Sequence, residues 1–146
     1  MANEIEAAQL AAGASALVAL AGFWFSHTQK KREDSRSERE LFESFNKRFD
    51  ILNDVLNDIS VSKPLSELTE VERHAVQDYL NLCSEEYLWY RRKLIGAEIW
   101  ESWLAGTKYY LGFKAIAELF EREKNIAIDS YYGFFEMLNR VKILKK

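Results

Sequence analysis

The sequence predicts an all-α protein in which one N-terminal transmembrane helix precedes a compact cytoplasmic bundle of about four helices. Three observations lead to this fold class. The 146 residues include only one Pro and six Gly, and such a composition favours uninterrupted helices. Apolar residues recur at steps of three and four from Phe42 onward, and no segment alternates with the period of two that a strand requires. A stretch near the N-terminus carries no charge at all.

The uncharged stretch covers residues 7–25, AAQLAAGASALVALAGFWF. Its length suits the hydrocarbon core of a bilayer, which a helix crosses with about 20 apolar residues. We therefore expect residues 7–25 to form a transmembrane helix and residues 1–6 to form a short external N-terminus. Membrane lipid is then one partner of this chain. A buried helix in a soluble protein and a cleaved signal peptide are the competing interpretations.

The flanks of this stretch predict its orientation. Glu4 and Glu6 precede it, whereas Lys30, Lys31 and Arg32 follow it. Because basic residues near a span favour the cytoplasmic side, we expect the N-terminus outside and the C-terminal domain in the cytoplasm. A signal peptide would begin with a basic region and end in small residues. Here the first residues are acidic, and the stretch ends in three aromatic residues that are typical of an interfacial belt.

Small residues within the uncharged stretch recur at steps of three and four and so share one helix face. In lipid, small residues allow helix backbones to approach closely, which favours packing against other transmembrane helices. The partner is then either a second copy of this chain or a larger membrane complex. The alternative is that any alanine-rich helix shows this spacing. The predicted packing face consists of Ala8, Ala11, Ala12, Ser15, Ala16, Ala19 and Gly22.

Residues 26–40 form a charged juxtamembrane segment in which acidic and basic side chains alternate. Such a segment is typical of a solvated helix or of a short flexible tether. Residues 41–146 are enough for one small domain with its own core, and we expect them to form the helical cytoplasmic domain.

The first amphipathic stretch of this domain has the spacing of a heptad repeat, over fewer than three repeats. A heptad pattern predicts a self-associating stalk below the membrane, which would make the chain a homo-oligomer. The same pattern is typical of an ordinary helix whose apolar stripe packs in the core of its own domain, and three Phe residues at these positions favour that alternative. The stripe consists of Phe42, Phe45, Phe49, Leu52, Leu56 and Ile59.

Turn and capping signals define the next helix. Pro64 ends the first helix of the domain, because proline stops helix propagation. Thr69 and Glu72 have the spacing of a capping box, and Ser66 is an alternative cap one turn earlier. We expect the helix that starts there to continue to residue 94 and to end at Gly96.

The remaining residues predict further helices, and glycines mark the positions where a helix is expected to kink or end. Another helix begins near Glu98, and we expect Gly106 and Gly112 to kink or break it. Residues 125–130 have the composition of a connector. Residues 131–144 show helical spacing and predict a closing helix.

Composition and motifs exclude several classes of function. The net charge of −3 argues against nucleic acid as a partner, because phosphate binding needs a basic surface. The single cysteine, Cys83, cannot form an internal disulfide, which is consistent with a reduced compartment. The chain has no glycine-rich phosphate loop and no Gly-x-Ser-x-Gly elbow.

The histidines do not suggest a metal site. His74 shares a helix face with Glu70 and Asp78, and His27 lies next to the uncharged stretch. The Glu-x-x-His pairs of di-iron bundles are missing, because position 71 is Val. We therefore expect no metal and no cofactor.

Glu85 and Glu86 lie within the most aromatic helix and are the candidates for a buried charge. Adjacent residues point about 100° apart on a helix, so at most one carboxylate can face the core directly. A buried carboxylate needs a cation or hydrogen-bond donors, and Arg91, Arg92 and Lys93 are nearby cations in the sequence. An acid, base or ligand is the functional interpretation. A structural ion pair or simple exposure is the alternative.

Aromatic residues are abundant in the domain, and we expect most of them to form its core. A few exposed ones would serve as anchors for a partner protein, because aromatic side chains often dominate interface energetics. The candidates are Phe42, Phe45, Phe49, Trp89, Trp100 and Trp103.

Three segments in fixed order resemble a set of small bacterial membrane-anchored helical proteins. These segments are LNLCSEEYLWY at 80–90, IWESW at 99–103 and SYYGF at 130–134. The resemblance implies a bacterial origin, an N-terminal span before a helical domain, and therefore the inner (cytoplasmic) membrane as the location. It implies no reaction and no catalytic residues.

Together these observations predict a non-enzymatic accessory, scaffold or regulatory subunit of a membrane protein complex. Such a subunit would dock through the small-residue transmembrane face and through the cytoplasmic helical domain. A homo-oligomeric membrane-anchored effector or sensor is the alternative. An enzyme that uses Glu85 or Glu86 is the third hypothesis.

Overall fold

A computed structural model describes the backbone of residues 2–126 and 128–140, and the side chains of residues 22–126 and 130–140. Contacts within the chain define two units, residues 1–37 and residues 38–146. The first helix, α1, spans Ala2–Asp58 and contributes to both units. The described residues contain only helices and connecting turns, and so the predicted all-α class is confirmed.

In the first unit, the charged segment that follows the uncharged stretch is helical, as part of α1. The solvated helix, and not the flexible tether, is therefore the correct alternative for residues 26–37. Within the residues that the structure describes, no helix combines the length and the apolar character that a bilayer crossing requires.

Most of the expected transmembrane segment lies outside the described side chains, which begin at Gly22. The same holds for the predicted packing face from Ala8 to Ala19. Gly22, the last member of that face, is exposed, and a Cβ atom there would meet no other atom within 4 Å.

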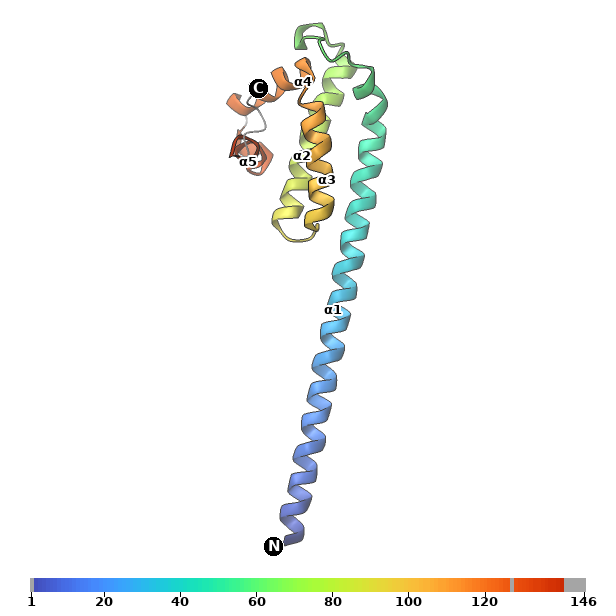
Figure 1. Cartoon of the computed structure of the whole chain (residues 1–146), viewed down its shortest axis with the longest axis vertical. Helices are drawn as coiled ribbons and strands as arrows, with labels where there is room; N and C mark the ends of the chain where they lie inside the picture. The colour runs from blue at the N-terminus through green and yellow to red at the C-terminus, as the bar shows by residue number, and fades with distance from the viewer. Residues whose placement is uncertain (1, 127, 141–146) are drawn as a thin grey trace. The chain divides into compact units, whose positions relative to one another are not determined.

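The second unit is a set of helices built around the hairpin of α2 and α3. Figure 1 shows α2 and α3 side by side and antiparallel, with α4 and α5 following them. The elements after α1 are η1 (Leu65–Glu67), α2 (Glu70–Arg91), α3 (Ala97–Tyr110), α4 (Lys114–Ile126), η2 (Ile128–Tyr131) and α5 (Phe134–Arg140).

The apolar stripe of α1 packs in the core of its own unit. Phe45, Leu56 and Ile59 are buried, with at most 3% of their surface exposed. The Phe49 ring contacts the rings of Tyr79 and Tyr110 at centroid distances of 6.2 and 6.1 Å. The core interpretation of this stripe is therefore confirmed, whereas self-association of the chain stays a prediction.

A polar contact accompanies this apolar packing. The Tyr110 hydroxyl of α3 contacts the Oδ1 atoms of Asn57 and Asn53 at 2.9 and 3.2 Å. The two asparagines are one turn apart on α1 and are bonded to each other at 3.0 Å. Because hydrogen bonds depend on distance and direction, this contact specifies how α3 is aligned along α1.

The link from α1 to α2 ends in the predicted capping box. The Thr69 hydroxyl accepts from the Glu72 backbone N–H at 3.2 Å, and the Glu72 carboxylate accepts from the Thr69 N–H at 2.7 Å. Lys63 donates to the same carboxylate at 2.7 Å. This lysine and the Thr69 N–H lower the pKa of Glu72. Ser66 lies in η1 and does not cap α2.

Several predicted boundaries shift by a few residues. The helix α2 ends at Arg91, before the predicted residue 94, because Lys93 adopts a positive φ of 60°. Gly96 is the N-cap of α3, where its N–H donates to Glu38 Oε1 at 2.6 Å. A Cβ atom on Gly96 would lie 2.9 Å from that oxygen, so glycine suits this contact.

The expected break at Gly112 is confirmed, whereas the expected kink at Gly106 does not interrupt α3. The helix α4 continues to Ile126, into the predicted connector. The closing helix begins later than predicted, at Phe134 instead of residue 131, and the structure describes it as far as Arg140. The last predicted residues, 141–144, lie outside the described residues.

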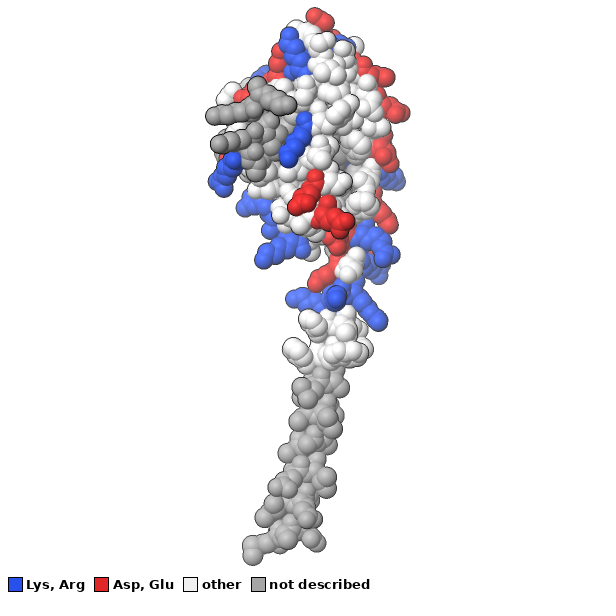
Figure 2. Space-filling model, in the orientation of Figure 1, with Lys and Arg blue, Asp and Glu red and all other residues white. Residues whose placement is uncertain are grey.

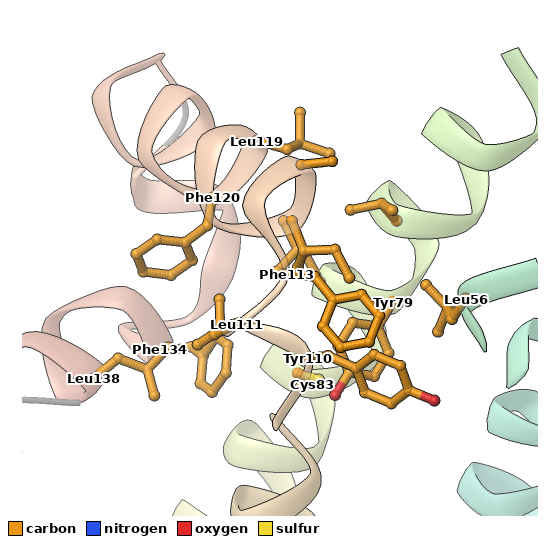
Figure 3. Packing of buried hydrophobic residues seen from close by; sticks show 14 of the residues in the cluster. Leu56, Tyr79, Cys83, Tyr110, Leu111, Phe113, Leu119, Phe120, Phe134 and Leu138 are labelled. Carbon is orange, nitrogen blue, oxygen red and sulfur yellow. The ribbon is translucent and has the colours of Figure 1, made fainter. Parts of the chain in front are cut away.

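The C-terminal helices α4 and α5 contribute further aromatic side chains to the core. Phe120 of α4 packs edge-on against Phe135 of α5 at a centroid distance of 4.4 Å. Phe134 and Leu138 of α5 are also fully buried. Figure 3 shows Phe120, Phe134 and Leu138 on one side of the cluster and Leu56, Tyr79 and Tyr110 on the other.

Replacement of Thr69 by Ala is expected to lower the free energy of unfolding by about 1 kcal/mol, because the first turn of α2 loses its side-chain cap. Urea denaturation followed by circular dichroism measures this change. Ser66→Ala is the matched control and should change the free energy by less than about 0.5 kcal/mol. Equal effects of the two substitutions would contradict the capping assignment.

Candidate functional site

The two adjacent carboxylates of α2 face two different clefts of the second unit. Glu85 lines the wider cleft, which has a volume of about 470 Å³. Glu86 lines the narrower cleft, which has a volume of about 190 Å³. The predicted divergence of neighbouring side chains on a helix therefore separates them into different environments.

Glu85 is paired with a cation from α1. Arg48 Nη1 and Nη2 donate to the two carboxylate oxygens of Glu85 at 2.7 and 3.0 Å. Such a two-point contact fixes geometry as well as charge. Both side chains are more than a third exposed, at 42% and 34%, so solvent weakens the contribution of the pair to stability.

The cations expected for this role lie elsewhere. Arg91 donates to the Tyr132 carbonyl oxygen at 2.9 Å, and Arg92 lies 5.1 Å from the centre of the Trp89 ring. The prediction that Arg91, Arg92 or Lys93 pairs with a buried carboxylate is wrong, because Arg48 pairs with Glu85 and is the cation that influences Glu86. These residues occupy the C-terminal end of α2, whereas Glu85 faces α1.

Glu86 is the buried carboxylate of the pair. Only 6% of its surface is exposed, and no described residue forms a hydrogen bond with its carboxyl group. Burial raises the pKa of Glu86 to about 8. The attraction of Arg48 opposes this shift, and the neighbouring charge of Glu85 adds to it. The carboxyl therefore holds its proton through the neutral range.

Cys83 lies one turn before Glu86 and is enclosed by neighbouring side chains. The Thr107 hydroxyl lies 3.5 Å from its sulfur and donates to the Trp103 carbonyl oxygen at 3.1 Å. Burial raises the pKa of the Cys83 thiol well above its usual value. A thiol in this state is a poor nucleophile. Burial also raises the pKa of Tyr79.

His74 lies apart from both clefts and is exposed. In the part of the chain that the structure describes, no group of three His, Cys, Asp or Glu residues is arranged to hold a metal ion. His74 lines neither the cleft of Glu85 nor the cleft of Glu86.

The expected aromatic contacts divide into buried and accessible ones. Phe45 and Trp100 are buried, and so they are wrong as partner contacts because their rings belong to the core. Phe42 is 39% exposed and stacks on Trp103 at a centroid distance of 6.0 Å. The rings of Phe49, Trp89 and Trp103 are half-buried.

Sequence reasoning missed two accessible apolar side chains that line the wider cleft. Ile51 is 71% exposed and Tyr132 is 46% exposed, and both line the wider cleft. Tyr132 has a positive φ of 52° and precedes Gly133, whose φ is 79°. Ile51 could have been found, because it lies off the apolar stripe of its helix. No pattern in the sequence indicated that Tyr132 would be exposed in a turn.

Charges of both signs cover the helical unit. Figure 2 shows basic and acidic side chains interspersed on the visible face of this unit, where neither sign forms a continuous surface. Mixed charge of this kind favours solubility and does not indicate a partner of one charge.

No protein-family model matches the chain, and neither a curated protein nor a solved structure is significantly similar to it.

The pKa of Glu86 predicts how stability changes with pH. The folded carboxyl holds its proton to about pH 8, whereas the unfolded one loses it near the ordinary value of 4.5. Protonated Glu86 therefore favours the folded state below pH 4.5, and this advantage is lost as the pH rises to about 8. The contribution falls by up to about 1.4 kcal/mol per pH unit over this range.

Replacement of Glu86 by Gln removes this titration. Urea denaturation between pH 5 and pH 8 should show that E86Q gains stability over the unmodified protein as the pH rises. E101Q is the matched control, because Glu101 is an exposed carboxylate on α3 and lines neither cleft. A constant difference between E86Q and the unmodified protein at all pH values would contradict the assignment.

Proposed function

We propose that this chain is a membrane-anchored, non-enzymatic accessory or scaffold subunit. Its N-terminus would lie outside and its helical unit would lie in the cytoplasm. The observation that carries the proposal is the uncharged run of residues 7–25, which is followed within seven residues by Lys30, Lys31 and Arg32. This pattern combines sufficient length for a bilayer with the charge bias of a cytoplasmic flank.

The end of the uncharged run supports the same proposal. Phe23, Trp24 and Phe25 are 74%, 69% and 59% exposed. Consecutive residues point in different directions on a helix, so a packed core would cover at most part of this set. A membrane interface accepts aromatic rings around the whole circumference of a helix.

The chemistry of the second unit supports docking over catalysis. Its one thiol, Cys83, is enclosed, and its buried carboxyl, Glu86, is protonated in the neutral range. The wider cleft instead presents Ile51, Tyr132 and the side chain of Arg48 at the surface. Aromatic and arginine side chains frequently dominate binding energy at protein interfaces.

The homo-oligomeric effector or sensor is the second candidate. The stripe from Phe42 to Ile59 does not support it, because most of this stripe contributes to the core of one chain. Self-association would therefore depend on the small-residue face of residues 8–22, which also serves the accessory hypothesis.

Charges placed within the uncharged run should prevent membrane anchoring. The double variant L17R/V18R is expected to move from the membrane pellet to the soluble fraction, because each arginine costs roughly 2.5–3.5 kcal/mol at a span centre. Carbonate extraction followed by ultracentrifugation measures the distribution. S60R/S62R adds the same charge at two exposed positions and should remain in the pellet. Unmodified protein in the supernatant would overturn the proposal.

A bulky residue on the small-residue face should weaken assembly without changing anchoring. A16L is expected to remain in the membrane fraction and to lose its partner, because close backbone approach is blocked. Native mass spectrometry after mild detergent extraction measures the complex, and A14L, off the predicted face, is the control. A stoichiometric foreign subunit supports the accessory function, whereas a pure homomer favours the effector. An unchanged complex in A16L contradicts docking through this face.

A further inference from the structure

The narrower cleft lies between α1 and α3, and α2 forms its floor. Phe49 of α1, Tyr79 of α2 and Trp103 of α3 give it three aromatic walls. The carboxyl group of Glu86 reaches it from α2, and the amide of Asn46 reaches it from α1. Figure 3 shows Tyr79 and Cys83, two of the residues that line this cleft, beside Tyr110 in the core.

Glu86 is the acidic residue of this cleft, and its carboxyl forms no hydrogen bond with a described residue. The nearest cation that influences it, Arg48, already forms two hydrogen bonds with Glu85. The groups that face Glu86 on its own helix are Glu85, Cys83 and Tyr79, and none of them supplies positive charge. The part of α3 that lines the cleft carries no charged side chain. A largely buried carboxyl group gains stability from a donor that enters the cleft.

The side chains that line the cleft determine which chemical class of ligand it can bind. Once Glu86 ionises, its carboxylate would repel an anion, and a neutral apolar molecule would leave the carboxylate without a donor. A hard divalent cation needs six or more oxygen ligands, which aromatic walls do not provide. An ammonium group can donate to the carboxylate while aromatic rings stabilise its positive charge.

The size of the cleft limits the ligand further. A volume of about 190 Å³ holds roughly six water molecules at about 30 Å³ each. A short aliphatic amine has a comparable size, and its carbon chain suits apolar walls. A large or branched polyamine would extend out of the cleft.

We propose that the cleft between α1 and α3 binds a small aliphatic ammonium compound, whose N–H groups donate to Glu86 and whose carbon chain packs against Phe49, Tyr79 and Trp103. The same ammonium chemistry is available from a free amine and from the lysine side chain of a partner protein. This inference is independent of the membrane anchor, since all of these residues belong to the second unit.

Titration of the full chain in detergent micelles with propylammonium chloride tests the site. The indole N–H resonance of Trp103 reports binding by nuclear magnetic resonance, and 1-propanol is the neutral ligand of similar size. We expect saturable shifts with propylammonium only, and tighter binding as the pH approaches 8, where Glu86 ionises. Equal binding of 1-propanol would overturn the proposal.

Two pairs of variants separate the site from general effects. E86Q should weaken propylammonium binding by about tenfold or more, the loss expected for one charged hydrogen bond, whereas E101Q should change it less than about twofold. G106L should block the cleft, because a Cβ atom at Gly106 meets no atom within 4 Å and the added chain enters free space. A105L, at the exposed neighbouring position, is its control.

The titrations still test the proposal when one of the two variants does not fold. Circular dichroism establishes that each variant is folded before titration, and the E86Q and G106L pairs test the site independently. Unchanged binding in both folded variants would refute the proposal. Weaker binding in either, with an intact control, supports it. A blocked lysine, Nα-acetyl-lysine methylamide, identifies the source: tighter binding than propylammonium assigns the site to a lysine of a partner, and weaker binding assigns it to a free amine.

Discussion

The packing of apolar helix faces around α2 is the constraint on which the second unit depends, and α1 contributes one of these faces. Phe45, Leu56 and Ile59 contribute the apolar surface, and Tyr110 adds a directional bond to α1. Burial of each large apolar side chain contributes about 1.5–3 kcal/mol. Both clefts have α1 as a wall, so without the packing of α1 neither cleft would exist and Glu86 would be solvated.

The same packing gives two neighbouring glutamates opposite properties. Glu85 meets Arg48 at the edge of α1 and forms a partly solvated ion pair. Glu86, one residue later, faces the interior between the helices and has its pKa raised by burial. An apolar residue of similar size would avoid the desolvation penalty at this position.

The proposed function combines a sequence pattern with this geometry. Cys83 is enclosed, and burial raises the pKa of both Cys83 and Glu86. The accessible side chains of Ile51 and Tyr132 lie at the wider cleft instead. An accessory subunit needs a tether and a recognition surface. In the proposed function, the uncharged run would be the tether and the helical unit would carry the recognition surface.

The sequence by itself determined the helices, the capping box at Thr69 and the break at Gly112, because these depend on interactions within one or two turns. It also determined the uncharged run that motivates the anchor. Only the tertiary structure decided that the α1 stripe is core, that Arg48 pairs with Glu85, and that Glu86 is the buried carboxyl. Arg48 and Glu85 are 37 residues apart, and local spacing carries no information about such a contact. Their meeting depends on how the apolar faces of α1, α2 and α3 pack together.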